Sequence, residues 1–299
     1  MSRLVANLLL LTAACLWGGA FVAQSEAGAW LNPGWFTGLR FALAFLAVLP
    51  LGLWEARRAR QKPRGMMGLV ALAVIFAIST FLQQWALSFT SVTHAGFLTG
   101  LYVIFVPMLE MLVLRRAAHP TVWGAALLAL AGTWCLGGRI SGLGFGDALI
   151  ILSAFGFAAQ IVLLQHVGRH TGRPVAAALA QSAACVLLGS GAGAVMSPLH
   201  LAAIYACLPQ LLYGGIISGG VAFLLQALCQ RHTGATDAAV MLMSESLFAA
   251  LFAALLLHER LSETGWIGCA LLFGALALAQ FGPAICCLLY TSDAADEED

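Results

Sequence analysis

Ten apolar stretches, most of them close to 20 residues long, restrict the fold of this sequence more than any other feature. A helix needs about 20 apolar residues to cross the ~30 Å hydrocarbon core of a bilayer. Only 9% of the residues are charged, whereas about 25% are charged in a typical soluble domain. The chain therefore predicts an all-α membrane protein with ten transmembrane helices. We expect these helices at Leu4–Ala23, Gly34–Trp54, Met67–Leu87, Ala95–Leu114, Thr121–Gly138, Asp147–Leu164, Val175–Val195, Leu211–Leu228, Ala238–Leu257 and Gly265–Phe281.

The remaining composition narrows the function class. A formal net charge of +1 provides no strongly basic surface, so we expect no nucleic-acid partner. The eight cysteines show no CxxC or Cys/His spacing, and we expect no cofactor or metal. No catalytic motif such as GxSxG, HExxH or Walker A occurs in a suitable setting, which argues against an enzyme. The expected partners are the lipid bilayer and a small-molecule substrate, and the sequence leaves open a monomer or a homodimer.

Lysine and arginine are distributed unevenly among the connections. With a cytoplasmic N-terminus, two basic residues, Arg139 and Arg260, lie in outside segments, and Arg40 lies within the second stretch. The inside segments hold the other eleven, namely Arg3, Arg57, Arg58, Arg60, Lys62, Arg64, Arg115, Arg116, Arg169, Arg173 and Arg231. Cytoplasmic loops carry the excess of positive charge in membrane proteins. We therefore expect a multi-pass protein of the bacterial inner membrane, with its N-terminus in the cytoplasm.

The two halves of the chain resemble each other. Residues 11–22 resemble residues 151–162 at an offset of 140, and residues 91–97 resemble residues 234–240 at an offset of 143. Five helices in each half is an odd number, so the second half enters the membrane upside down. Inverted repeats place a binding site near the bilayer midplane between the halves and permit alternating access. Chance similarity between apolar helices is the competing interpretation.

These observations divide the chain into three parts. We expect a first five-helix repeat at 1–140 and a second at 145–283. Residues 284–299 lose the apolar periodicity, and residues 287–297 resemble the translated read-through of a sequencing-library adapter. We expect this end to be a non-native tail, the alternative being a genuine acidic tail.

Several motifs, in this order and spacing, resemble one family. They are Leu-Trp-Gly at 16–18, Arg-Phe at 40–41, Gln-Arg at 230–231, Ser-Glu-Ser-Leu-Phe-Ala-Ala at 244–250 and Leu-His-Glu-Arg-Leu-Ser at 257–262. The chain resembles the drug/metabolite transporter superfamily, specifically its ten-helix EamA-type members, over about residues 5–281. One departure is Ser246, where the family often has proline, and it puts a kink in the ninth helix in doubt.

The resemblance implies a secondary transporter that commonly exports small metabolites, including amino acids. A multidrug or nucleotide-sugar carrier is the alternative within transport, and a membrane-embedded enzyme is the alternative from another class. The resemblance also implies that the first, third, fourth, sixth, eighth and ninth helices surround the cavity. It therefore favours six cavity residues, namely Trp17, Gln84, Tyr102, Gln160, Gln226 and Glu245.

Glu245 is the deepest carboxylate in the chain, seven residues into the ninth stretch. A polar group in lipid needs a partner or a water-filled cavity, so Glu245 indicates a site for a substrate amine or a proton. A hydrogen bond that merely fixes helix packing is the alternative. Tyr102 occupies the matching position in the fourth stretch at the 143-residue offset.

The other polar residues have plainer alternatives. Trp17 lines a cavity, packs in the core or faces lipid. The glutamines Gln83, Gln84, Gln160 and Gln226 line a cavity or join helices by hydrogen bonds. We expect Arg40, six residues into the second stretch, to reach outward to the interface. The alternatives are capture of a substrate carboxylate and a pairing with an acid. The GxxxG pairs Gly96/Gly100, Gly189/Gly193 and Gly215/Gly219 predict close helix contacts.

The charge asymmetry generates a test of topology. Reporter fusions after Arg64 and Arg116 are expected to report cytoplasm, and a fusion after Arg139 is expected to report periplasm, because basic loops stay inside. Paired phosphatase and fluorescence reporters make the measurement. A reversal at any one of the three sites contradicts the ten-helix topology.

Overall fold

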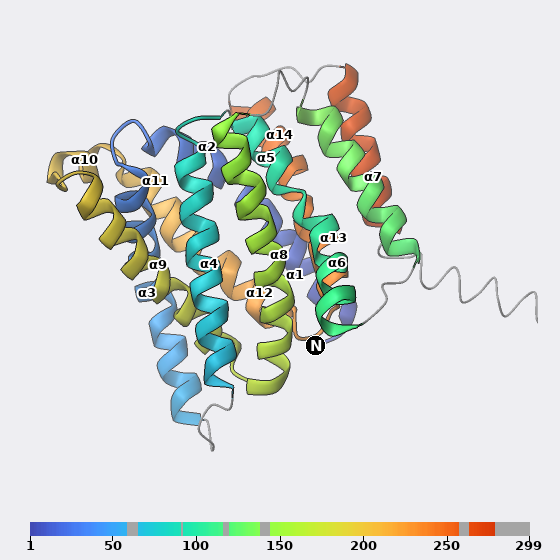
Figure 1. Cartoon of the computed structure of the whole chain (residues 1–299), viewed down its shortest axis with the longest axis horizontal. Coiled ribbons are helices and arrows are strands. Elements are labelled where there is room, and N and C mark those ends of the chain that lie inside the picture. The colour runs from blue at the N-terminus through green and yellow to red at the C-terminus, as the bar shows by residue number, and fades with distance from the viewer. Residues whose placement is uncertain (59–64, 91, 116–119, 138–143, 257–262, 279–299) are drawn as a thin grey trace, which may run out of the picture.

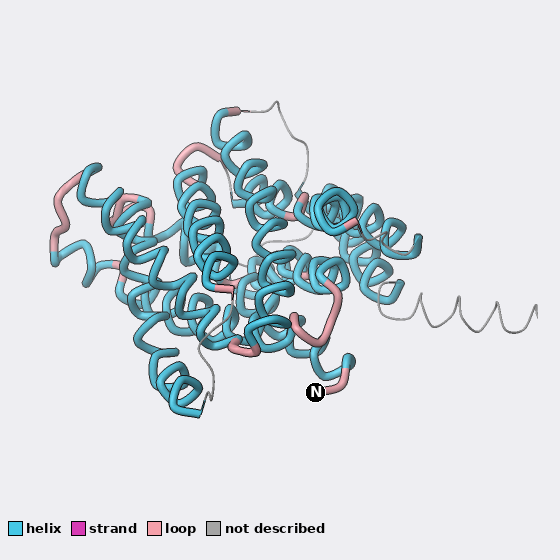
Figure 2. The backbone as a smooth tube through the Cα atoms, turned by 60° about the horizontal axis from the view of Figure 1, so that its bottom comes forward, coloured by secondary structure: helices cyan, strands magenta, loops and turns pink. Residues whose placement is uncertain are grey.

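A computed structural model describes residues 1–58, 65–90, 92–115, 120–137, 144–256 and 263–278 of the protein. These residues form helices joined by short loops, and no strand occurs among them (Figure 1, Figure 2). The elements are α1 (Arg3–Gly18), α2 (Ala20–Ala27), α3 (Pro33–Arg58), α4 (Met66–Ala86), α5 (Val92–Thr99), α6 (Tyr102–Leu114), α7 (Pro120–Gly137), α8 (Phe145–Thr171), α9 (Pro174–Met196), α10 (Leu201–Ala206), α11 (Leu208–Leu212), the π-helix η1 (Tyr213–Ala222), α12 (Phe223–Cys229), α13 (Ala235–Met243) and α14 (Glu245–Leu256). A further helix covers Glu263–Leu278.

Seven segments of the described chain are long and apolar enough to cross a membrane. They are Arg3–Ala27, Pro33–Arg58, Met66–Ala86, Ala95–Val113, Phe145–Thr171, Pro174–Met196 and Leu208–Cys229. Two shorter apolar helices, Pro120–Cys135 and Glu263–Leu278, accompany them. The expectation of an all-α, multi-pass membrane protein is confirmed. The expected tail, 284–299, lies outside the described residues.

Large apolar side chains cover the outside of the bundle. Leu187 is 77% exposed, and Leu112, Leu46 and Phe273 are each more than 60% exposed. In water such a surface would be costly at roughly 25 cal/mol per Å² of apolar area. A belt of exposed leucine, valine and phenylalanine is therefore the surface that contacts lipid tails.

Two of the seven membrane-spanning segments are interrupted, and so is the apolar helix pair α13 and α14. α1 and α2 meet at Gly19, α5 and α6 meet at Gly100 and Leu101, and α13 and α14 meet at Ser244. The last break needs no proline, because the Ser244 hydroxyl donates to the Met241 carbonyl at 2.6 Å and its N–H bonds the same carbonyl. Serine bonds of this kind to the preceding turn bend helices. The kink that Ser246 had put in doubt is present two residues earlier.

α3 and α9 pack backbone to backbone. A Cβ atom on Gly189 would lie 3.0 Å from both the Gly34 carbonyl oxygen and the Gly38 Cα, and one on Gly193 would lie 2.7 Å from the Trp35 nitrogen. Glu55, near the end of α3, accepts the N–H groups of Val175 and Ala176 in the first turn of α9. The crossing therefore rests on two facing GxxxG pairs and a cap supplied by the neighbouring helix.

The predicted GxxxG contacts hold at two of the three pairs. A Cβ on Gly215 of η1 would lie 2.7 Å from the Arg40 carbonyl oxygen of α3, and Gly189/Gly193 packs as described above. Gly96 has no neighbouring atom within 4 Å of such a Cβ, so the first pair is not a close helix contact along its length. α3 is thus held between α9 and η1, which fixes the position of Arg40.

This crossing generates a test of stability. Gly189→Leu is expected to lower the free energy of unfolding by about 2 kcal/mol or more, because the new side chain overlaps the backbone of α3. Gly191→Leu is the matched control, since it lies on the same helix with no atom within 4 Å of a Cβ. Thermal unfolding in detergent compares the two. Equal melting temperatures for both variants would show that α3 and α9 do not meet at Gly189.

Candidate functional site

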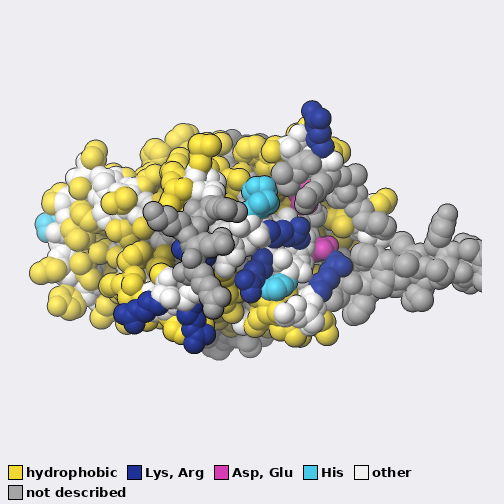
Figure 3. All heavy atoms as spheres, turned by 90° about the horizontal axis from the view of Figure 1, so that it is seen from below, with side chains coloured by type: hydrophobic (Ala, Val, Ile, Leu, Met, Phe, Trp, Pro, Cys, Tyr) yellow, Lys and Arg dark blue, Asp and Glu magenta, His cyan; other side chains and the backbone are white. Residues whose placement is uncertain are grey.

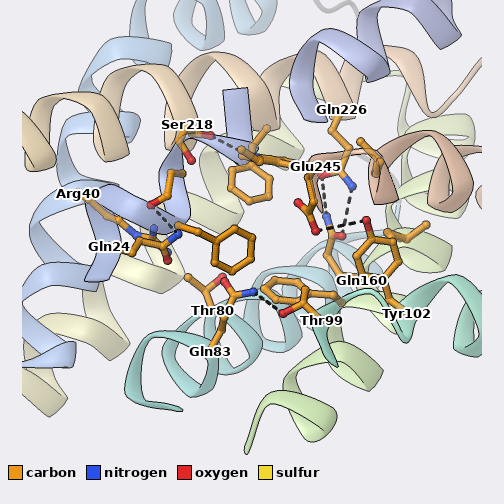
Figure 4. A pocket seen from close by; sticks show the side chains of 17 residues that line it. Gln24, Arg40, Thr80, Gln83, Thr99, Tyr102, Gln160, Ser218, Gln226 and Glu245 are labelled. Atoms are coloured by element: carbon orange, nitrogen blue, oxygen red, sulfur yellow. Dashed lines mark hydrogen bonds between the residues drawn. The ribbon is translucent and has the colours of Figure 1, made fainter. Parts of the chain in front are cut away.

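One cavity lies in the interior of the helix bundle, with a volume of about 60 Å³ (Figure 4). Ligand pockets typically measure about 300–1,000 Å³, so this one is narrow. Its polar side chains form two groups on opposite sides (Figure 4). The first group contains Gln24, Arg40 and Thr80, and the second contains Tyr102, Gln160, Gln226 and Glu245.

Helix breaks place Tyr102 and Glu245. Tyr102 is the first residue of α6 and Glu245 is the first residue of α14, each directly after a break. Their side chains are 4% and 6% exposed, and the Tyr102 hydroxyl donates to Glu245 Oε1 at 3.5 Å. A bond of this length is weak. The N-terminus of a helix carries partial positive charge, which stabilises a carboxylate there by about 0.3–2 kcal/mol.

Three glutamines from three helices form a buried cluster beside Glu245. Gln160 of α8 donates to Gln181 Oε1 of α9 at 2.8 Å, and Gln160 and Gln226 of α12 lie within 3.5 Å of each other through two amide contacts. Gln160 is 1% exposed. Because a buried amide without a partner costs about 1–3 kcal/mol, the cluster holds the three helices together and fixes the amides that face the cavity.

Aromatic rings occupy the middle of the cavity. Trp17 and Phe223 have ring centroids 4.6 Å apart, and Phe223 lies 4.7 Å from Phe76. The Trp17 indole N–H donates to the Ser218 carbonyl of η1 at 3.1 Å. Trp17 is therefore held in one orientation, with its ring against Phe223 and not against lipid.

Arg40 differs from the expectation that it would reach outward. It is 4% exposed and lines the cavity, with its guanidinium 5.4 Å from the ring of Phe36 and 4.9 Å from that of Phe41. Its position six residues into the span would permit snorkelling, but α3 packs against α9 and η1, and the Arg40 side chain lies beside Gly214 of η1. A stack of this kind is worth about 0.5–2 kcal/mol, less than the several kcal/mol of desolvation that a buried charge costs.

Both halves of the chain match one family model. The EamA-like transporter family matches residues 4–138 and again residues 144–281. The chain belongs to the EamA-like transporter family. The expected resemblance is confirmed, and the protein is a membrane transporter by family.

Relatives and a solved structure agree with this EamA-like assignment. An "uncharacterized transporter" of Archaeoglobus fulgidus is 31% identical over 94% of this chain and 87% of its own length. The "uncharacterized transporter YwfM" of Bacillus subtilis is 27% identical over 93% of this chain and 94% of its own length. A crystal structure superposes with a TM-score of 0.76 at 21% identity, covering 92% of this chain and 98% of the other. That likeness concerns the fold alone.

Five of the six cavity residues expected from sequence line the cavity of this EamA-like protein, namely Trp17, Tyr102, Gln160, Gln226 and Glu245. Gln84 does not line it. Its amide donates to the Gln24 carbonyl of α2 at 3.3 Å, while the adjacent Gln83 lines the cavity and donates to Thr99 at 3.1 Å. Successive residues of a helix point about 100° apart, and here Gln83 faces the cavity while Gln84 faces α2.

Sequence reasoning missed several lining residues. Gln24 lies just past the expected end of the first helix, and Ser218 lies in the glycine-rich run that becomes η1. Thr80 and Thr99 carry small hydroxyls that are common in apolar helices. Gln83 is different, because the sequence left a cavity position open for it, and a 143-residue offset relates it to Gln226.

Proposed function

We propose that this protein is a secondary transporter of the bacterial inner membrane that exports small metabolites, such as amino acids, by alternating access. Its ten helices form two inverted five-helix repeats, 1–140 and 145–283, with the N-terminus in the cytoplasm. The observation that carries the proposal is a cavity at the meeting point of interrupted helices, with one carboxylate and one cation among its lining residues.

Helix packing supports the inverted repeat. At an offset of about 143 residues, each helix of the first repeat has a counterpart in the second. The counterpart of α1 is α8, that of α4 is η1 with α12, and that of α6 is α14. Counterpart helices make counterpart contacts. α6 packs on α8, and its counterpart α14 packs on α1. Likewise α4 packs on α8, and its counterpart α12 packs on α1. α3 packs directly on its own counterpart, α9.

The placement of charge supports the orientation. The Arg3–Asp237 ion pair, 2.6 Å long, joins the start of α1 to the start of α13, and Gln165, near the end of α8, donates to the Thr233 carbonyl. These helix ends therefore share one face, and basic side chains gather on it (Figure 3). Arg139 and Arg260, expected on the opposite side, lie outside the described residues.

The cavity supports a small amphiphilic substrate. Glu245 suits an amine, and the Trp17 and Phe223 rings suit an apolar group, with about 1 kcal/mol from aromatic stacking. A nucleotide sugar would bring two phosphates to a lining with a single guanidinium among the described residues. The helix breaks at Gly19, Gly100 and Ser244 act as hinges. Bending at these hinges widens the narrow cavity toward one side of the membrane or the other.

A substrate panel tests the transport assignment. Expression is expected to protect cells against toxic analogues of apolar or aromatic amino acids, and proteoliposomes are expected to show saturable counterflow of the natural compounds. Counterflow of radiolabelled amino acids measures exchange without assuming a coupling ion. If only lipophilic cations or nucleotide sugars exchange, the substrate class is wrong, and if no solute moves through folded protein, transport itself is wrong.

Replacement of the buried carboxylate tests the amine site. Glu245→Gln is expected to reduce counterflow more than tenfold, because an amide no longer balances the charge of an ammonium group. The amount of folded protein should change little, since glutamine still accepts the Tyr102 hydroxyl. Glu263→Gln is the matched control, because Glu263 is exposed and lies outside the cavity. Normal flux with normal pH dependence in the Glu245 variant would remove this residue from the mechanism.

A further inference from the structure

Arg40 is a buried cation that has no anionic partner among the residues that the structure describes. Its guanidinium lines the cavity, its Nε has no hydrogen-bond partner, and it forms no ion pair with any residue that the structure describes. The side chain is only 4% exposed, so bulk water does not surround it. Charged residues this deep in a membrane span mark pathways and binding sites and are normally paired.

The surroundings of Arg40 leave one direction open for a partner. Phe36 and Phe41 stack against the guanidinium, and neither ring is a hydrogen-bond acceptor for an in-plane N–H. Gln24, in the same part of the cavity, is also incompletely bonded, because its Oε1 has no partner while its amide nitrogen donates to the Ala20 carbonyl. The cavity is a space from which an anion can reach the guanidinium (Figure 4).

Glu245 does not fill this role, although it lines the same cavity. A chain of aromatic rings separates the two charges. The Arg40 guanidinium lies 4.9 Å from the Phe41 ring, Phe41 lies 6.0 Å from Phe223, and Phe223 lies 4.6 Å from Trp17. Figure 4 shows Arg40 and Glu245 on opposite sides of the cavity with rings between them. The cavity therefore has a cationic end, an apolar middle and an anionic end.

We propose that Arg40 is the subsite for a carboxylate of the transported solute, an inference that rests on the proposed transport function and names its substrate class. The planar guanidinium presents paired N–H donors that match a carboxylate. With an ammonium group at Glu245, the preferred solute is a zwitterion whose amine and carboxylate are separated by a short apolar chain. An α-amino acid, whose two charges are adjacent, engages one end at a time.

Competition in counterflow tests this inference with matched compounds. Proteoliposomes exchange radiolabelled norleucine, and unlabelled 6-aminohexanoate, its isomer with separated charges, competes. The amide 6-aminohexanamide has the same chain and amine without the carboxylate. In the wild type the acid is expected to compete at about tenfold lower concentration than the amide and than norleucine, because a charge-assisted pair replaces an unpaired buried charge.

Variants assign the preference to Arg40. In Arg40→Gln, the acid and the amide are expected to compete at about the same concentration. Arg40→Lys is expected to retain part of the preference for the acid, since lysine keeps the positive charge but lacks the paired N–H donors of the guanidinium. Arg58→Gln is the control, because Arg58 lies on the same helix and stacks 4.1 Å over Trp54 but is exposed and outside the cavity. Size-exclusion profiles and melting temperatures establish that each variant folds.

The outcomes separate this inference from the function on which it rests. Equal competition by acid and amide in the wild type, or an acid preference that survives in Arg40→Gln, overturns the carboxylate subsite while norleucine exchange leaves transport intact. If Arg40→Gln does not fold, the subsite is judged from two other results. These are the acid-to-amide preference of the wild type and its partial loss in Arg40→Lys. Failure of every amine-bearing compound to exchange in folded wild-type protein overturns the transport proposal and the subsite with it.

Discussion

The hydrocarbon core of the bilayer contains no hydrogen-bond donor or acceptor, and this single constraint organises the structure. Polar side chains within the spans must find partners inside the protein, because each unsatisfied group in lipid costs several kcal/mol. The outer belt accordingly consists of exposed apolar side chains such as Leu187 and Phe273. Gln160, Gln226 and Glu245 turn inward, and the cavity is the place where their side chains meet.

The same constraint explains why helix breaks occur where they do. A broken helix frees backbone groups, and these need partners of their own. Near the Gly19 break, the Tyr213 hydroxyl donates to the Leu16 carbonyl at 2.8 Å. At Ser244 the side chain and backbone both bond Met241, which tightens the turn. Irregular backbone is therefore placed beside the cavity and away from lipid, where new helix N-termini present Tyr102 and Glu245.

Sequence reasoning reached the all-α membrane class and named five of the residues that line the cavity, because apolar length and intramembrane polarity are strong physical signals. It could not choose correctly between Gln83 and Gln84, since adjacent residues differ only by a helical rotation that depends on neighbouring helices. It also expected Arg40 to reach outward, because snorkelling is argued from position along one helix, whereas the packing of α3 against α9 and η1 depends on the whole fold. Gly34 and Gly38 form a GxxxG pair that is visible in the sequence. That this pair packs against Gly189 and Gly193 of α9 depends on the tertiary structure.

The two ends of the cavity differ in how completely their polar groups are bonded, and the difference has a physical consequence. At the Glu245 end, a helix N-terminus and the Tyr102 hydroxyl offset part of the cost of the buried carboxylate, and the glutamines bond one another. At the Arg40 end, two phenyl rings stack on the guanidinium, and no described residue forms an ion pair with it. The binding free energy is most favourable where polar groups of the free protein lack hydrogen-bond partners. Binding there removes the cost of an unpaired buried group and also forms a new bond. A solute that carries an anion, if it binds as proposed, would therefore change the energy of the protein most at the Arg40 end, on a helix held between α9 and η1.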